Sequence, residues 1–301
     1  MRPADVAGVA VLATVWGTNF LLVEEALEGL NPAQVVAVRL ALGGVALLLL
    51  VRATRAALPR KGSTWVKLAG MGLLGQAIPW LLFASGQEEV TSALAGLYTG
   101  LTPLLTIPVA WLFLRDRPSP AAIGACLVGF AGLAVVLAPW SGGGDVSLRG
   151  QLLCLGGAAC YAVAYSYAGR MMKTVDDTKL SLAASQALTA IVIMVPATSG
   201  HLVEPATATW LIVVCLVLLG LGTAVAFLVN YWLIARVGPV SASLAFYLIP
   251  VVAVVAGVVV RGERLHPNEI AGSVLILVAL AALYLWERAR DKRAPVAAPA
   301  R

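Results

Sequence analysis

Charged residues are scarce in this sequence. Only 12% of its 301 residues are Asp, Glu, Lys or Arg, whereas about 25% is usual in a soluble domain, and 60% are hydrophobic. The apolar character extends over the whole length, with a mean hydropathy of +0.90. This composition excludes a soluble globular protein, a disordered chain and a disulfide-rich secreted domain. We interpret the chain as an all-α polytopic membrane protein.

Cysteine and histidine are also rare, and neither forms a recognisable site. Four cysteines lie inside apolar runs without CxxC or CxxxH spacing: Cys126, Cys154, Cys160 and Cys215. They indicate free core thiols and neither a metal site nor a disulfide framework. The two histidines, His201 and His266, fall in loops, and no Ser/His/Asp cluster is evident. We therefore expect no enzymatic activity, no metal and no cofactor.

Ten apolar segments are long enough to cross a bilayer, which requires about 20 residues of helix. The predicted spans are 5–23, 33–51, 64–85, 92–114, 120–138, 150–169, 180–197, 209–233, 240–260 and 268–286. Glu24, Glu25 and Glu28 follow the first segment, which lacks a small-residue cleavage site and is therefore predicted to be a span and not a signal peptide.

The distribution of Lys and Arg predicts the orientation. With the N-terminus in the cytoplasm, seventeen of the 21 basic residues lie on the cytoplasmic side, and only Arg149, Arg261 and Arg264 lie in outer loops. Both termini are therefore predicted to be cytoplasmic. The net charge of +6 is then a topology signal that requires no nucleic-acid partner. Residues 288–301 are expected to form a disordered basic tail near anionic lipid.

The sequence repeats itself with an offset of 147 residues. The aligned pairs include Gly75 with Gly222, Pro103 with Pro250, Asp116-Arg117 with Glu263-Arg264, and Pro120 with Pro267. Near the start the offset is about 145, which aligns Trp16 with Tyr161. Residues 1–140 and 148–287 would each hold five spans, joined by the Gly-rich stretch 139–147. Since five is odd, the halves must have opposite topology, a plan that recurs in secondary transporters with a midplane substrate site.

Three motifs carry a resemblance to a known family. They are Trp16-Gly17-Thr18-Asn19-Phe20 followed by Glu28 to Pro32, Arg39 in the next span, and Gly262 to Pro267 before the last span. Together they resemble the EamA-domain transporters of the drug/metabolite transporter superfamily, across about residues 5–286. The chain is most similar to the aromatic-amino-acid exporter group. The resemblance implies ten spans, a bacterial inner-membrane location and export of amino acids or related metabolites. Arg115-Asp116-Arg117 departs from the more frequent Gly-Glu-Arg but keeps an acidic-basic pair.

Aromatic and amide side chains at helical spacing predict the substrate path, because residues three and four apart share a helix face. The predicted substrate-binding residues are Trp16, Asn19, Gln76, Trp80, Tyr98, Thr102, Tyr161, Tyr165, Asn230 and Tyr247. The alternatives are anchoring at the membrane interface and hydrogen bonding between helices. Trp16, Trp80, Tyr161 and Asn230 favour a cavity most, because each lies well inside its span.

Two prolines and one arginine stand out inside the spans. Pro103 and Pro250 occupy equivalent places and predict a hinge or gate, with a static kink as the alternative. Arg39 would cost about 2.5–3.5 kcal/mol at mid-membrane on insertion scales. Its side chain either extends outward to the membrane surface, binds a backbone carbonyl, or contacts a substrate carboxylate.

These features favour a carrier of small neutral or zwitterionic metabolites, most of all an exporter of amino acids including aromatic ones, that acts as a monomer in the lipid bilayer. The alternative is an exporter of other metabolites or cationic drugs by proton antiport. That alternative requires a membrane-embedded carboxylate, and residues 10–15 of the first span contain none. None of the 15 acidic residues lies mid-span, so we expect transport without a proton-coupling carboxylate.

Overall fold

The structure is a computed structural model, and it describes residues 3–115, 117–137, 147–171, 174–175, 177–242 and 244–293. These residues form helices and connecting loops, with no strand among them. The α-helices are α1 (Pro3–Leu27), α2 (Pro32–Ala53), α3 (Gly62–Gly72), α4 (Ile78–Gly86), α5 (Ser92–Thr99), α6 (Thr102–Val109), α7 (Pro120–Leu137), α8 (Leu148–Met171), α9 (Lys179–Ala197), α10 (Ser199–Leu202), α11 (Trp210–Ala242), α12 (Leu244–Ala256) and α13 (Pro267–Arg293). Three π-helical turns continue them: η1 (Leu73–Ala77), η2 (Ala110–Leu114) and η3 (Gly257–Arg261).

Within these ranges, seven helices are long and apolar enough to cross a membrane. Two shorter apolar helices, Pro120–Val136 and Ala245–Arg261, occupy the predicted spans 120–138 and 240–260. Helix α8 occupies the predicted span 150–169. Many outward-facing valine and leucine side chains are exposed, as expected where lipid replaces water as the surrounding solvent.

Two helices extend beyond the predicted segments. The apolar part of α11, Trp210–Leu233, matches the predicted span 209–233, and the helix continues to Ala242. In this extension Arg236 forms an ion pair with Asp5 of α1. The tail predicted to be disordered from 288 is helical as far as Arg293, since glutamate, arginine and lysine form helix readily. The predicted linker 139–147 lies outside the described residues, apart from Ser147.

Polar caps fix where several helices begin. Asn31 Oδ1 accepts a hydrogen bond from the Gln34 backbone nitrogen at 2.9 Å, and Gln34 Oε1 accepts one from the Asn31 backbone nitrogen at 3.0 Å. This capping box, with Pro32 at the first helical position, starts α2. Thr178, 147 residues after Asn31, caps α9 through the Ser181 nitrogen. The same kind of start therefore recurs in both halves.

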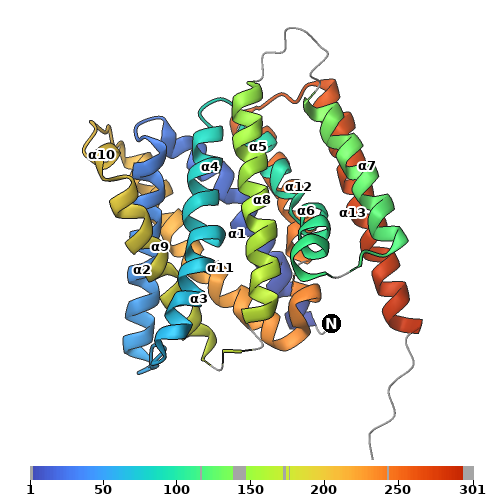
Figure 1. The fold of residues 1–301 in the computed structure, drawn as a ribbon. Coiled ribbons are helices and arrows are strands. Elements are labelled where there is room, and N and C mark those ends of the chain that lie inside the picture. Colours follow the sequence, from blue (N-terminus) through green and yellow to red (C-terminus); the bar gives the residue numbers. More distant parts are fainter. Residues whose placement is uncertain are drawn as a thin grey trace, which may run out of the picture.

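The structure repeats other local features at the same offset. The π turns η2 and η3 begin 147 residues apart, at Ala110 and Gly257. Each is followed by a residue with left-handed backbone, Arg115 (φ 57°) and Gly262 (φ 68°). Three corresponding pairs of helices pack across the two halves: α7 with α13, α5 with α12, and α2 with α9. The contact of α1 with α11 is repeated by the contact of α8 with α4, their counterparts. In Figure 1, α1 begins at the lower end of the bundle, whereas α8, its counterpart, begins at the upper end.

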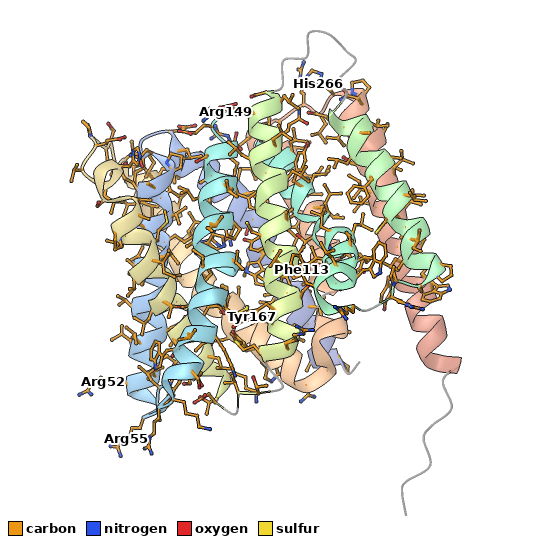
Figure 2. The ribbon with its side chains drawn as sticks, in the orientation of Figure 1. Arg52, Arg55, Phe113, Arg149, Tyr167 and His266 are labelled. Carbon is orange, nitrogen blue, oxygen red and sulfur yellow. The ribbon has the colours of Figure 1, made fainter. Side chains whose placement is uncertain are left out.

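Charged side chains gather at the two ends of the bundle. Figure 2 shows Arg52 and Arg55 at the lower end, and Arg149 and His266 at the upper end. At the upper end, Glu89 accepts hydrogen bonds from Ser147 and Arg149, which hold the pKa of that carboxyl below its usual range. The side chains between the ends are predominantly apolar.

Candidate functional site

A cavity lies in the middle of the bundle. Its volume, measured for water-sized groups, is about 90 Å³. This is several times the roughly 10–15 Å³ that one water needs. It therefore has room for a small metabolite. The helices that line it are α1, α2, α3, α4, α5, α8, α9, α11 and α12, together with the π turn η1.

The cavity lining combines equivalent residues of the two halves. At the offset of 145, the lining pairs are Trp16 with Tyr161, Asn19 with Ala164, Phe20 with Tyr165, and Val23 with Ala168. At 147, they are Arg39 with Gln186, Trp80 with Phe227, Phe83 with Asn230, Ala84 with Tyr231, and Thr99 with Phe246. The cavity therefore lies where the two halves of the sequence meet.

Aromatic rings form much of the wall. The centroid of Trp16 lies 5.3 Å from that of Phe246 and 6.3 Å from that of Phe227. On the other side, Phe83 stacks on Tyr161 at 5.8 Å. These separations are typical of favourable aromatic pairs. The wall therefore offers flat apolar surfaces that can contact an aromatic or aliphatic side chain.

Arg39 points into this cavity. Its Nε donates to Thr223 Oγ1 at 2.9 Å, and its guanidinium carbon lies 3.6 Å from the centroid of the Trp80 ring. The Asn19 amide, oriented so that both its atoms are satisfied, accepts from Arg39 Nη2 at 2.8 Å. The residue is only 7% exposed. The structure thus excludes an Arg39 side chain that extends outward to the membrane surface. It also excludes a backbone carbonyl as the main partner of Arg39. The remaining alternative is a side chain that faces the cavity.

Six of the ten predicted site residues line the cavity, and four do not. The six are Trp16, Asn19, Trp80, Tyr161, Tyr165 and Asn230. Tyr98 is buried elsewhere, where its hydroxyl donates to Gln151 Oε1 at 2.8 Å. Tyr247 packs near Tyr284 of α13, with ring centroids 6.1 Å apart. Gln76 and Thr102 are buried outside the lining.

Irregular helix geometry explains the misplacement of Gln76 and Thr102. Gln76 lies in the π turn η1, and a π turn rotates the residues before it relative to those after it. Its neighbour Gly75 therefore faces the cavity with Trp80. The span of Thr102 is interrupted between α5 and α6, at residues 100–101, and Thr99 lines the cavity instead.

The predicted hinge prolines have different surroundings. Pro103 lies in the first turn of α6, directly after that interruption, whereas Pro250 lies inside the continuous helix α12. The two regions touch, since a Cβ atom added to Gly100 would lie 2.7 Å from Pro250 Cγ. Movement at either proline stays a prediction.

Sequence reasoning missed Gln186 and Tyr231, which form a buried pair in the lining. The Tyr231 hydroxyl donates to Gln186 Oε1 at 2.8 Å. Gln186 could have been found from the repeat, because it is the counterpart of Arg39. The repeat gives no such signal for Tyr231, whose counterpart is Ala84.

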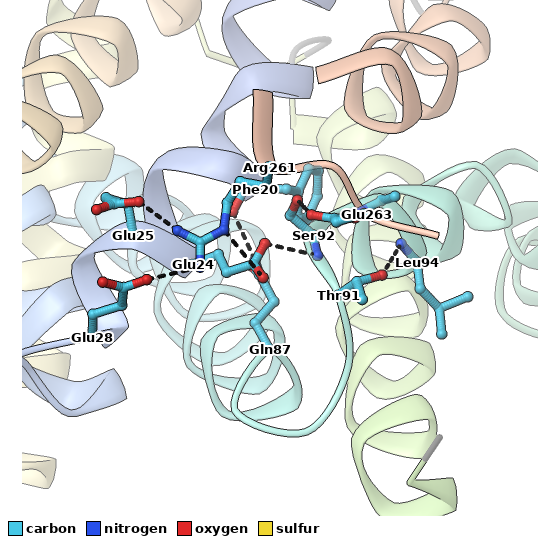
Figure 3. A network of polar contacts seen from close by, with 11 residues as sticks. Phe20, Glu24, Glu25, Glu28, Gln87, Thr91, Ser92, Leu94, Arg261 and Glu263 are labelled. Atoms are coloured by element: carbon cyan, nitrogen blue, oxygen red, sulfur yellow. Dashed lines mark hydrogen bonds and ion pairs between the residues drawn. The ribbon is translucent and has the colours of Figure 1, made fainter. Parts of the chain in front are cut away.

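A network of charged side chains joins the two halves at the upper end (Figure 3). Arg261, the last residue of η3, donates to Glu25 at 2.6 Å and to Glu28 at 2.7 Å, both on or next to α1. Glu263 accepts from the Ser92 hydroxyl and, at 3.0 Å, from the Ala93 nitrogen at the start of α5. These contacts hold α1, α5 and η3 together above the cavity.

A family profile matches almost the whole chain. The EamA-like transporter family profile matches residues 6–138 and 148–285, once on each half. The chain belongs to the EamA-like transporter family. It is therefore a multi-pass membrane transporter with a two-repeat EamA domain, and the predicted resemblance is confirmed.

Individual relatives agree with this assignment. The protein named "Uncharacterized transporter YvbV" of Bacillus subtilis (strain 168) is 26% identical over 280 residues, covering 90% of this chain and 88% of the relative. The "Probable terminal-alkyne amino-acid exporter" of Streptantibioticus cattleyicolor is 24% identical over 303 residues, covering all of both chains. A crystal structure with 20% identity covers 98% of this chain and 100% of the solved chain, with a TM-score of 0.67, and supports the fold alone.

Proposed function

We propose that this EamA-family transporter exports amino acids, aromatic ones included, across a bacterial inner membrane. The main support for this proposal is the cavity that equivalent residues of both repeats line. Inverted repeats with a shared central site are the structural basis of alternating access in secondary transporters. The opposite starting ends of α1 and α8 support this reading (Figure 1). The transporter would have ten spans and act as a monomer.

The six cavity-lining residues predicted from the sequence are the proposed substrate contacts, together with the cavity-facing Arg39. The aromatic wall suits an apolar or aromatic side chain. A cationic drug is disfavoured, because Arg39 brings a positive charge and the described lining contains no Asp or Glu. The amino-acid exporter from Streptantibioticus cattleyicolor supports the substrate class by analogy alone.

The function is tested by counterflow in proteoliposomes. Vesicles loaded with unlabelled L-phenylalanine should accumulate external labelled L-phenylalanine transiently, because the unlabelled internal substrate competes with the label for the carrier on the way out. Vesicles loaded with buffer, and vesicles without protein, are the controls. Simple equilibration in loaded and unloaded vesicles alike would indicate that the protein is no carrier of this amino acid.

The orientation is tested by cysteine labelling in intact cells, in a background without the four natural cysteines. A cysteine at Lys61, between α2 and α3 at the lower end, should resist a membrane-impermeant thiol reagent because we place it in the cytoplasm. A cysteine at Pro205, in the loop before α11 at the other end, should react. The reverse pattern would contradict the proposed orientation, and reaction at both sites would contradict the ten spans.

Energy coupling gives a further prediction. The described cavity lining contains no carboxylate or histidine, and Glu269 lies at the start of α13, where it accepts from the His266 nitrogen at 2.7 Å. With equal L-phenylalanine on both sides, an imposed pH gradient should therefore produce no accumulation. Accumulation that a protonophore abolishes would show that a titratable group acts in the path.

A further inference from the structure

Arg39 brings a positive charge into the cavity that no neighbouring side chain balances. Its recorded partners are all neutral: the Thr223 hydroxyl, the Asn19 amide and the Trp80 ring. Among the described residues, no Asp or Glu forms an ion pair with it or lines the cavity. The other polar side chains of the described lining carry hydroxyls, amides and the indole N–H groups of Trp16 and Trp80, all of them uncharged.

A buried charge is normally paired, because neutral dipoles replace its lost hydration incompletely. The guanidinium has five N–H donors, and the contacts with Thr223 and Asn19 use Nε and one N–H of Nη2. The terminal pair of nitrogens keeps further donors for an incoming ligand. Two parallel N–H groups match the two oxygens of a carboxylate.

Only one of the two equivalent positions in the repeats carries this positive charge. Gln186, the counterpart of Arg39, also lines the cavity but is neutral and is already bonded to the Tyr231 hydroxyl at 2.8 Å. The cavity therefore has one cationic side and one uncharged polar side. A solute with a carboxylate at one end would be held in a single orientation.

We propose that Arg39 binds the carboxylate of the transported solute, so that a free carboxylate is required whereas an amino group is not. This proposal rests on the proposed function and assigns the chemical class that the same cavity selects. The aromatic wall then contacts the remainder of the solute. Amines and carboxyl-blocked amino acids bind less well because they leave the guanidinium without a counter-charge.

The test is competition against counterflow of labelled L-phenylalanine by wild-type protein. Unlabelled L-phenylalanine and 3-phenylpropionate should compete, whereas L-phenylalanine amide should compete about tenfold less well or worse, the scale expected for a lost charge-assisted hydrogen bond. Equal competition by the amide would overturn the role of Arg39 while leaving the carrier function intact. Absence of L-phenylalanine counterflow would overturn both.

Variants of Arg39 test whether this residue causes the preference for a free carboxylate. Arg39→Gln, which places in the first repeat the residue of the second, should lose the preference for L-phenylalanine over its amide, and Arg39→Lys should keep part of it. Arg52→Gln removes an exposed arginine at the lower end and should keep the full preference. Full preference in folded Arg39→Gln would overturn the proposal; if that variant does not fold, the wild-type competition decides.

Discussion

Replacement of Trp80 by alanine should reduce amino-acid transport about 30-fold. The indole forms part of the aromatic wall and lies against the Arg39 guanidinium at 3.6 Å. A desolvated cation–π contact contributes about 2 kcal/mol, and each 1.36 kcal/mol corresponds to a factor of ten. Trp16→Ala and Tyr161→Ala should reduce transport less, because both variants keep the Trp80 ring over the Arg39 guanidinium. Initial rates of counterflow, normalised to folded protein, measure the effect.

Two controls separate this effect from a folding defect, since Trp80 is only 4% exposed. Trp80→Phe keeps an aromatic face and should retain most of the transport. Trp111→Ala removes a tryptophan that is 59% exposed, on η2 away from the cavity, and should transport normally. If Trp16→Ala, Trp80→Ala and Tyr161→Ala all transport at the wild-type rate, the cavity is not the substrate site.

Replacement of Gly96 by valine should destabilise the bundle. A Cβ atom at Gly96 would lie 2.1 Å from Ala253 Cβ, at the contact between α5 and α12, and 3.3 Å from the Phe20 ring. Overpacking of this kind costs about 1–3 kcal/mol, occasionally more. The expected result is a lower melting temperature and a lower yield of monodisperse protein in detergent.

Gly124→Val is the matched control for that substitution. It introduces the same β-branched side chain into helix α7, at a glycine with nothing within 4 Å of an added Cβ atom. Its melting temperature should stay close to that of wild type. Equal stability of Gly96→Val and Gly124→Val would contradict the close packing of α5 against α12.

The apolar segments of the sequence predicted the helices well, because the length of an apolar run follows directly from membrane thickness. Helical spacing also brought Trp16, Trp80 and Tyr161 to one cavity. It failed where the helix is irregular, at Gln76 in a π turn and at Thr102 after an interruption. It also failed for Tyr98, because a mid-span tyrosine can face a neighbouring helix as easily as a cavity.

Arg39 shows a different limit. Hydropathy predicted the cost of its charge but not the direction of its side chain. That direction depends on Thr223 and Trp80, which come from helices distant in the sequence. The repeat nevertheless contained part of the answer, because it pairs Arg39 with Gln186, and both line the cavity.

We propose that one cavity between the repeats opens alternately to the two sides of the membrane. A single cysteine at Ala164, the cavity-lining counterpart of Asn19, tests it in proteoliposomes of known orientation. The thiol should react with an impermeant reagent applied from either side, and L-phenylalanine should slow both reactions. Reaction from one side only, or rates that L-phenylalanine leaves unchanged, would contradict alternating access at this site.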